Sequence, residues 1–454
     1  MSIFHERKVV VRMAPSPTGH LHIGTVRTAL FNYLFAQHNK GEFILRIEDT
    51  DKERSTKEFE EEIVSGLQRI GITWDGFYRQ SERGAIYRTY LEKMVARGSA
   101  YVSKEESKMR PGEFVEVVRL KNPNATISFS DEIRGEISFD TTELGDFVIA
   151  RSLDDALYHF TVVVDDHEMG VTHVIRGEDH ISNTPRQILI QEAIGARRPT
   201  YAHLPLILAP DRSKLSKRHG AVMMSEYESQ GFLHEALINY LALLGWNPGT
   251  DQELFTLKEL ITFFDISGVQ KSGAIFNIDK LRWFNKEYLM KCAENTFREY
   301  ARAFIPESIA SLPQYSDARM EKLFSLIRER TSIGSDITND FASGEYAFAF
   351  ATPHHDAHMI KWKNDATPKD TLSRLQKIAE IIATMPEELT AETAKEYLWD
   401  YACEVGKGEV LWPLRVSLTG RERSPDPFTV IAILGSAESY KRVITACDTI
   451  LRAS

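Results

Sequence analysis

The sequence predicts an α/β fold for the N-terminal half of the chain and an all-α fold for the rest, from three observations. A short apolar run, a Gly/Pro-rich turn and an amphipathic helical pattern follow one another within residues 8–34. Between about 81 and 152 the pattern changes to short β-like runs separated by Asn-Pro-Asn and Gly, which is typical of an insertion. Beyond about 226 the apolar spacing is almost wholly helical.

The first predicted element is a strand over Lys8–Val11, which enters a turn at 12–25. The helix after the turn has apolar residues at i, i+3, i+4, i+7 and i+8, namely Val26, Ala29, Leu30, Tyr33 and Leu34. Such a turn presents the free N–H groups and the positive dipole end of the helix to an anion, typically a phosphate. Pro15 stiffens the turn, and Gly24 permits close approach of the backbone to a ligand. A rigid connection without a ligand is the alternative.

A second predicted strand, Phe43–Ile47, ends in the acidic residues Glu48, Asp49 and Asp51. The carboxyl ends of strands are where open parallel sheets bind ligands. An acidic strand end can also be a helix cap or a solvated turn, which is what we expect of Asp49 and Asp51.

The α/β pattern resumes near Tyr158, and 172–180 predicts a strand that runs into a loop, with Arg176 at its end. An arginine at this place often makes an ion pair or lies on the surface. Further on, Lys214-Leu-Ser-Lys-Arg218 occupies a polar loop behind an apolar run. Two lysines and one arginine within five residues can reach the phosphates of one nucleotide.

Four stretches in this order resemble the motifs of one family. His22-Ile-Gly-Thr25 and Lys214-Leu-Ser-Lys-Arg218 are similar to the signature pair of class I aminoacyl-tRNA synthetases. With Arg12-Met-Ala-Pro-Ser-Pro-Thr-Gly19 and Arg46-Ile-Glu-Asp-Thr-Asp51, the chain resembles glutamyl-tRNA synthetase of the bacterial type over nearly its whole length.

The resemblance implies a class I Rossmann-like catalytic domain with an inserted α+β connective domain, followed by all-α stem-contact and anticodon-binding domains. The implied boundaries are 1–80 for the first half of the catalytic domain, 81–152 for the insertion that holds the tRNA acceptor end, 153–225 for the second half, 226–295 for the stem-contact domain and 296–454 for the anticodon-binding domain. In the last domain, Arg330 and Arg415 match positions that read anticodon bases.

The resemblance also implies a glutamate site. Arg12 and Arg176, with Tyr158, match residues that hold the side-chain carboxylate of glutamate, and Glu48 matches the residue that faces its ammonium. Ala14 and Ser16 complete the implied site. A guanidinium fork grips a planar carboxylate with two charge-assisted hydrogen bonds. A glutamine amide would leave one buried donor unpaired, which costs about 1–3 kcal/mol, so the pair favours glutamate.

ATP is the implied second substrate, accompanied by Mg²⁺ that bridges its phosphates. The implied catalytic residues are His22, Gly24, Thr25, Lys214 and Lys217. The wider set that binds ATP adds Pro15, Ser16, Asp179, Ile207, Leu215, Ser216 and Arg218. Thr25 stands where the general motif has a second histidine, so its role depends on a hydroxyl group. Val162 stands where some relatives have an asparagine that touches the amino acid, and we leave it out.

Composition excludes several classes of protein. Apolar residues make up 43% and charged residues 26% of the 454 residues, as in soluble globular proteins, and no apolar run approaches the roughly 18 residues of a membrane span. The first 25 residues lack the apolar core of a signal peptide, so we expect a cytoplasmic protein. The net charge of −10 argues mildly against a nucleic-acid binder, but binding depends on the local field of one face.

Metal binding by the protein itself is not expected. The three cysteines, Cys292, Cys403 and Cys447, lie far apart and lack C-x-x-C spacing, which indicates a reducing compartment and no structural zinc. Asp165, His167 and His173 could suggest a metal cluster, but their spacing across a strand does not put all three on one face.

The oligomeric state is expected only from the resemblance: relatives suggest a monomer.

Several alternatives stay open. A glutaminyl-tRNA synthetase shares the scaffold, but Arg176 and an all-helical C-terminal region fit it less well. A truncated paralogue that glutamylates a tRNA base lacks the C-terminal third. An RNA-binding regulator descended from a synthetase would keep the fold and lose ATP turnover. The enzyme could accept only tRNA(Glu) or also tRNA(Gln), and Arg330 weakly favours the strict form. The family generally needs tRNA before it activates the amino acid.

Overall fold

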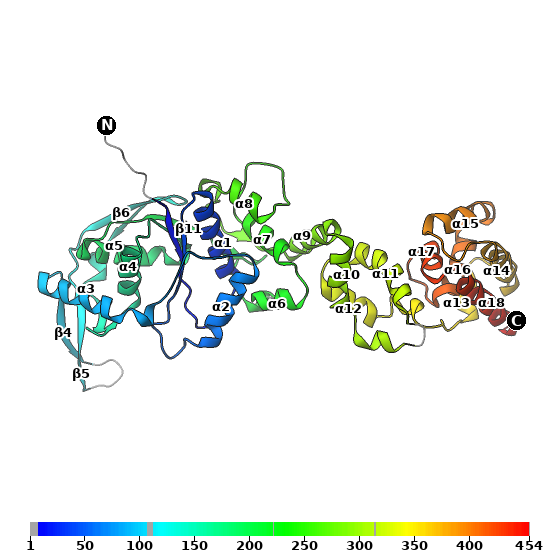
Figure 1. Cartoon of the computed structure of the whole chain (residues 1–454), viewed down its shortest axis with the longest axis horizontal. Coiled ribbons are helices and arrows are strands. Elements are labelled where there is room, and N and C mark those ends of the chain that lie inside the picture. The colour runs from blue at the N-terminus through cyan, green and yellow to red at the C-terminus, as the bar shows by residue number, and fades with distance from the viewer. Residues whose placement is uncertain (1–7, 107–111, 221, 313–314, 454) are drawn as a thin grey trace. The chain divides into compact units, whose positions relative to one another are not determined.

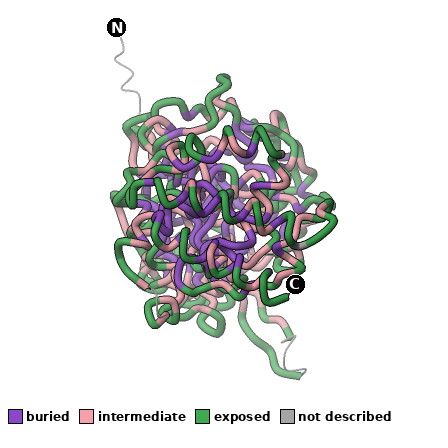
Figure 2. Tube along the Cα trace, turned by 90° about the vertical axis from the view of Figure 1, so that its right-hand side faces the viewer, coloured by how far each residue is buried: buried purple, intermediate pink, exposed green. Residues whose placement is uncertain are grey.

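The computed structural model describes residues 8–106, 112–220, 222–312 and 315–453 (Figure 1). Its internal contacts divide the chain into two compact units, Met1–Asn285 and Lys286–Ser454. Figure 2 shows that buried residues lie inside the folded chain and exposed residues on its outside. The first unit is α/β and the second is helical, as the sequence predicts.

The first half of the catalytic region is a parallel sheet of order β1-β2-β3 with helices attached. Its elements are β1 (Val10–Met13), α1 (Ile23–His38), β2 (Glu42–Ile47), α2 (Lys57–Arg69) and β3 (Gly76–Arg79). The predicted apolar stripe of α1 is buried at every position, including Val26 and Leu30, which are fully covered. The prediction missed β3, because it is short and only half-buried.

The second half consists of α4 (Tyr158–Glu168), β10 (His173–Gly177), η3 (Glu178–Asn183), α5 (Thr184–Ile194) and β11 (Thr200–Leu204). The backbone N–H of Thr172, just before β10, donates to the carbonyl oxygen of Val10, and the N–H of Val10 donates to Oγ1 of Thr172, each at 2.9 Å, so the starts of β1 and β10 lie beside each other. The structure corrects one assumption of the sequence analysis: Asp165 and His167 lie on helix α4 and not on a strand. Among the described residues, no three His, Cys, Asp or Glu side chains are placed to hold a metal ion.

The insertion shares a sheet with this second half. It begins with η1 (Gln80–Glu82) and α3 (Gly84–Arg97), and β4 (Ala100–Glu106), β5 (Phe114–Leu120), β8 (Phe147–Ser152) and β9 (Asp155–Ala156) form one antiparallel sheet. The hairpin of β6 (Thr126–Asp131) and β7 (Gly135–Asp140), followed by η2 (Thr142–Leu144), instead extends the other sheet in the order β10-β11-β6-β7. The short β-like runs expected in this region lie at 115–120, 126–129, 136–139 and 147–150 and correspond to β5, β6, β7 and β8. The sequence did not predict β4, β9 or the shared sheet.

The rest of the first unit is mainly helical. Its elements are β12 (Ile207–Leu208), η4 (Lys217–His219), α6 (Met224–Ser229), α7 (His234–Leu243), α8 (Leu257–Phe263), η5 (Ile266–Gly268), β13 (Ala274–Ile275) and α9 (Ile278–Lys291), which crosses into the second unit. The parallel pair of β12 and β13 ties this region to the loop after β11.

The second unit is helical throughout its described part. Its elements are α10 (Glu294–Arg302), η6 (Glu307–Ser311), α11 (Asp317–Arg330), α12 (Gly334–Ala342), η7 (Ala347–Ala349), α13 (Ala357–Ile360), α14 (Pro368–Ala383), α15 (Ala391–Val405), α16 (Lys407–Thr419), α17 (Pro427–Leu434) and α18 (Ser436–Ala453). Arg442 of α18 is buried and donates to the carbonyl oxygens of Phe348 and Leu418, each at 2.8 Å, which joins three segments of the core.

Candidate active site

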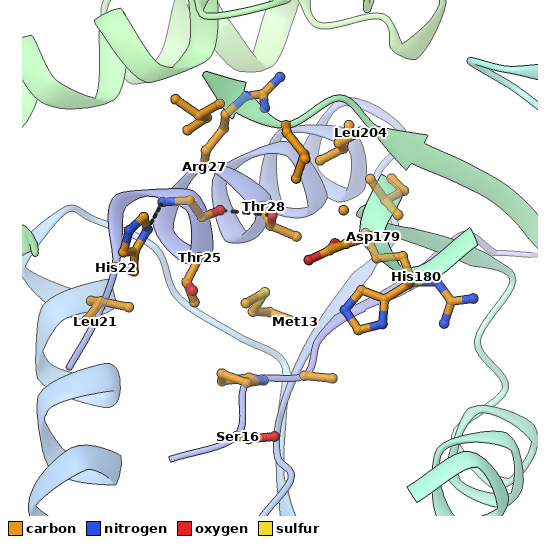
Figure 3. Close-up of a pocket in the computed structure, with 18 of the residues that line it drawn as sticks. Met13, Ser16, Leu21, His22, Thr25, Arg27, Thr28, Asp179, His180 and Leu204 are labelled. Carbon is orange, nitrogen blue, oxygen red and sulfur yellow. Dashed lines mark hydrogen bonds between the residues drawn. The ribbon is translucent and has the colours of Figure 1, made fainter. Parts of the chain in front are cut away.

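A cavity of about 630 Å³ opens where β1, β2 and β10 end and α1 begins (Figure 3). It gathers fourteen of the residues singled out from the sequence: Arg12, Ala14, Pro15, Ser16, His22, Gly24, Thr25, Glu48, Tyr158, Arg176, Asp179, Ile207, Lys214 and Leu215. These come from segments up to two hundred residues apart, and the parallel sheet brings them together.

Other lining residues were not predicted: Met13, Arg27, Thr28, Val162 and Leu206 are among them. Thr28 follows Gly24 by one helical turn and bonds its carbonyl oxygen at 3.0 Å, so the helical period could have found it. Arg27 donates to the carbonyl oxygen of Pro205 at 2.7 Å, and burial lowers its pKa to about 10. Val162, which we had left out, lines the cavity with an apolar surface.

The N-terminus of α1 is capped by His22. The Nδ1 atom of His22 accepts a hydrogen bond from the backbone N–H of Gly24 at 3.0 Å (Figure 3). A neutral imidazole that accepts at Nδ1 carries its proton on Nε2. Burial, together with the nearby Lys214 ammonium, lowers the pKa of His22 and favours this neutral form. His22 therefore has a donor available for a ligand beside the helix terminus.

The basic loop after β12 is only partly at the cavity. Lys214 and Leu215 line it, and the Lys214 ammonium lies 3.4 Å from the Asp179 carboxylate. Ser216 caps η4, in which Lys217 and Arg218 lie, and these three do not line the cavity. Nothing in the sequence indicated that this half of the loop would lie in a 3₁₀ turn outside the cavity lining.

Beneath the cavity lies a buried charge network centred on Arg46. Its guanidinium donates to Asp166 at 2.8 Å and to Glu48 at 3.0 Å, and Asp165 lies 3.8 Å from its Nε. Arg12 donates through Nε to Asp166 at 3.2 Å. Burial alone would lower the pKa of Arg46, but the three carboxylates raise it. Burial raises the pKa of Glu48, which the Arg46 charge only partly opposes.

Arg176 differs from Arg12 and Arg46 because it has no carboxylate partner within 4 Å in the described part of the chain. Its side chain is buried, donating through Nε to Nε2 of His203 at 3.2 Å and through Nη2 to Thr184 at 2.8 Å. Burial, with a smaller effect of the nearby Arg12, lowers the pKa of Arg176. A buried cation that is hydrogen-bonded but not neutralised attracts an anionic ligand.

Tyr158 and His180 form the wall beside Arg176. The Tyr158 hydroxyl lies 3.4 Å from Nδ1 of His180, and the amide of Asn183 lies 3.2 Å from the same atom. Burial raises the pKa of Tyr158 to about 12, so its hydroxyl keeps its proton. Burial, with the charge of Arg176, lowers the pKa of His180 to about 4, so this ring is neutral.

The two predicted anticodon residues lie on different helices of the second unit. Arg330 ends α11 and forms an ion pair with Glu345. Arg415 lies on α16, half-buried, and its Nε atom has no hydrogen-bond partner among the residues that the structure describes.

Comparisons with known proteins agree with this architecture. The catalytic domain of class I tRNA synthetases (E and Q) matches residues 8–110 and 104–283, and an anticodon binding domain matches 296–447. The chain is thus a class I aminoacyl-tRNA synthetase.

No helix in the described part is long and apolar enough to cross a membrane.

The similar proteins narrow this class to a single family. The glutamate–tRNA ligase of Aquifex aeolicus is 41% identical over 97% of this chain and 99% of its own length, and that of Carboxydothermus hydrogenoformans is 39% identical over 96% and 99%. A crystal structure of a glutamate tRNA ligase from Elizabethkingia meningosepticum, in complex with its amino acid, superposes with a TM-score of 0.85 at 34% identity and covers 98% of this chain and all of that one. The chain belongs to the family of glutamate–tRNA ligases, which confirms the resemblance found in the sequence.

Proposed function

We propose that this enzyme ligates L-glutamate to the 3′ end of tRNA(Glu) in two steps. The α-carboxylate of glutamate attacks the α-phosphate of ATP in line, which gives glutamyl-adenylate and pyrophosphate. The terminal ribose hydroxyl of the tRNA then displaces AMP. Neither step needs an enzyme nucleophile, so the protein contributes positioning and stabilisation of charge.

One observation carries the choice of glutamate: the buried, carboxylate-free guanidinium of Arg176 beside Arg12 in the cavity. An anionic side chain neutralises this charge and can accept a bidentate hydrogen bond, whereas a glutamine amide cannot do either fully. The hydroxyl of Tyr158 adds a third donor. Glu48 then takes the ammonium group, with Ala14 and Ser16 beside the bound amino acid.

ATP binds with its phosphates against the N-terminus of α1. The Nε2–H of His22 and the positive dipole end of α1 bind them from one side, and Lys214 from the other. Lys217 and Arg218 join them after a movement of the loop. Mg²⁺ would accompany ATP and supply further neutralisation of its phosphates.

The rest of the chain serves the tRNA. The insertion at 81–152 binds the acceptor end, 226–295 the inner bend and 296–454 the anticodon, with Arg330 and Arg415 reading bases. We assign the enzyme to the cytoplasm as a monomer. Strict use of tRNA(Glu) is favoured by Arg330, and use of tRNA(Gln) as well is the alternative.

Glutamate-dependent ATP–pyrophosphate exchange, with and without tRNA, tests the proposal, with glutamine as the control substrate. We expect exchange with glutamate only, and only when tRNA is present. Silence with every amino acid, from protein that still binds tRNA, would overturn the enzymatic function and favour a tRNA-binding regulator.

A further inference from the structure

Three neighbouring strands place a row of buried polar side chains behind the glutamate site. The strand order β10-β11-β6 brings Arg176, His203 and Asp131 side by side, and Arg176 is the register partner of His203. The exposed fractions are 6% for Arg176, 0% for His203 and 2% for Asp131. Asp131 belongs to the inserted hairpin, so this row joins the insertion to the catalytic region.

The hydrogen bonds of the row determine where the proton of His203 lies. The Nε–H of Arg176 can only donate, so Nε2 of His203, at 3.2 Å, must be the acceptor. The proton of the neutral ring is then on Nδ1, which donates to Oδ2 of Asp131 at 2.6 Å. Burial lowers the pKa of His203 despite the Asp131 charge, in agreement with a neutral ring.

We infer that the Asp131–His203 pair is a positioning element for amino-acid recognition, which orients the guanidinium of Arg176 without neutralising it. This inference rests on the proposed function of Arg176. A carboxylate in contact with Arg176 would hold it equally firmly but would compete with the carboxylate of the substrate. The neutral imidazole of His203 instead holds Nε of Arg176. The negative charge of Asp131, which fixes the tautomer of His203, stays one side chain further away from Arg176.

The remaining donors of Arg176 are thereby assigned. Its Nη2 donates to Thr184 at 2.8 Å, which fixes the plane of the guanidinium. Its Nη1 has no hydrogen bond to any other described residue, and the side chain lines the cavity. A guanidinium held on one edge presents its other edge to a ligand in a single orientation, which lowers the entropy cost of binding.

Asp131→Asn is the informative variant because the backbone N–H groups of the turn after Asp131 fix the orientation of the new amide. Oδ1 accepts two backbone N–H groups, from Ile133 at 3.0 Å and Arg134 at 2.8 Å, whereas Oδ2 accepts the single backbone N–H of His203 at 3.1 Å, so the asparagine oxygen takes the place of Oδ1. The amide NH₂ then faces Nδ1 of His203, which has to accept. The proton of His203 moves to Nε2 and opposes the Nε–H of Arg176, as in the aspartate-to-asparagine change of a Ser-His-Asp triad.

The experiment is glutamate-dependent ATP–pyrophosphate exchange on the full chain with tRNA. For Asp131→Asn we expect the KM for glutamate to rise roughly 10- to 100-fold, the effect of one lost hydrogen bond to a charged group, while the KM for ATP stays within about twofold. Asp146→Asn is the matched control, because this carboxylate in the same insertion accepts from Asn122 at 2.8 Å and Tyr101 at 2.9 Å but does not touch His203. It should leave both KM values within about twofold of wild type.

A second pair of variants covers the case in which Asp131→Asn fails to fold. The amide of His203→Gln reaches the place of Nε2 and that of His203→Asn does not, so the glutamine variant should retain the lower KM for glutamate. Long-range ¹H–¹⁵N NMR should find the His203 proton on Nδ1 in wild type and on Nε2 in Asp131→Asn.

An unchanged KM for glutamate in Asp131→Asn with the shifted proton would overturn the inference, as would equal KM values for the two His203 variants. Equal rises of the KM for glutamate and for ATP would also overturn it, since a purely structural role predicts that result. Wild-type protein without any glutamate-dependent exchange would instead refute the proposed function, and the NMR result would still report on the pair.

Discussion

Replacement of Asp166 by asparagine tests the buried charge network beneath the cavity. The Asp166 side chain is 8% exposed and contacts Arg12 and Arg46, which are 5% and 0% exposed. Removing one partner of a buried ion pair costs about 3–5 kcal/mol, and asparagine keeps one acceptor oxygen, so we expect about 3 kcal/mol. At about 2–4 °C for each kcal/mol, the first unit should melt about 6–12 °C lower.

The pH dependence of this loss has a definite sign. Burial would raise the pKa of Asp166, but Arg12 and Arg46 lower it. A carboxyl whose pKa is lowered by folding stabilises the protein fully above its unfolded value of about 3.9 and loses that effect as the pH falls through the lowered value. The deficit of the variant should therefore persist from pH 8 to pH 5.

Differential scanning calorimetry measures the effect, with the second unit as an internal reference. Glu92→Gln, which removes one of the two exposed partners of Arg88 on α3, should not shift the transition measurably. A shift for Asp166→Asn that is no larger than this control would refute the assignment of the network as a stabilising core.

Three further predictions concern the cavity and its surroundings. Glu48→Gln should raise the KM for glutamate about tenfold or more, because it removes a charged hydrogen bond to the substrate. In wild type the raised pKa of Glu48 should make this KM rise toward acidic pH, and the variant should lack that rise. The same pH profile of KM in both proteins would contradict this role of Glu48. Lys214→Ala should lower kcat of the exchange about 100-fold, with partial recovery in Lys214→Arg; an unchanged kcat would remove Lys214 from the site. Burial lowers the pKa of His159 to about 4, so the unfolded chain binds the extra proton and the unfolding free energy should fall between pH 6.5 and 4. His159→Gln should flatten that slope in denaturant titrations, whereas the surface substitution His358→Gln should not.

The sequence predicts those parts of the fold in which one periodicity decides the element. The apolar spacing from Val26 to Leu34 fits a helix and no other element, and each apolar position of this stripe in α1 is buried. The local sequence near Val162–Val164 does not predict its own structure. Its β-branched residues favour a strand, and only tertiary packing makes this segment part of the helix α4. The β-like spacing there led us to treat Asp165 and His167 as strand residues.

Motif residues of the candidate site were predictable, whereas the groups that support them were not. Arg176 stands at the end of a recognisable strand. His203 and Asp131 are separated by 72 residues and meet only because β6 joins β11, which no local pattern indicates. The 3₁₀ turn that contains Lys217 likewise depends on side-chain contacts of Ser216 with His219.

The sheet shared by β6, β7, β10 and β11 has a consequence for biogenesis. The hairpin at 126–140 emerges from the ribosome some sixty residues before the strand Thr200–Leu204 with which it pairs. The β6 edge of the hairpin therefore stays unpaired until β11 has been synthesised, and non-local pairing of this kind slows folding. The insertion cannot be treated as an exchangeable module: a chimaera that replaces it must also supply a strand edge matched to β11.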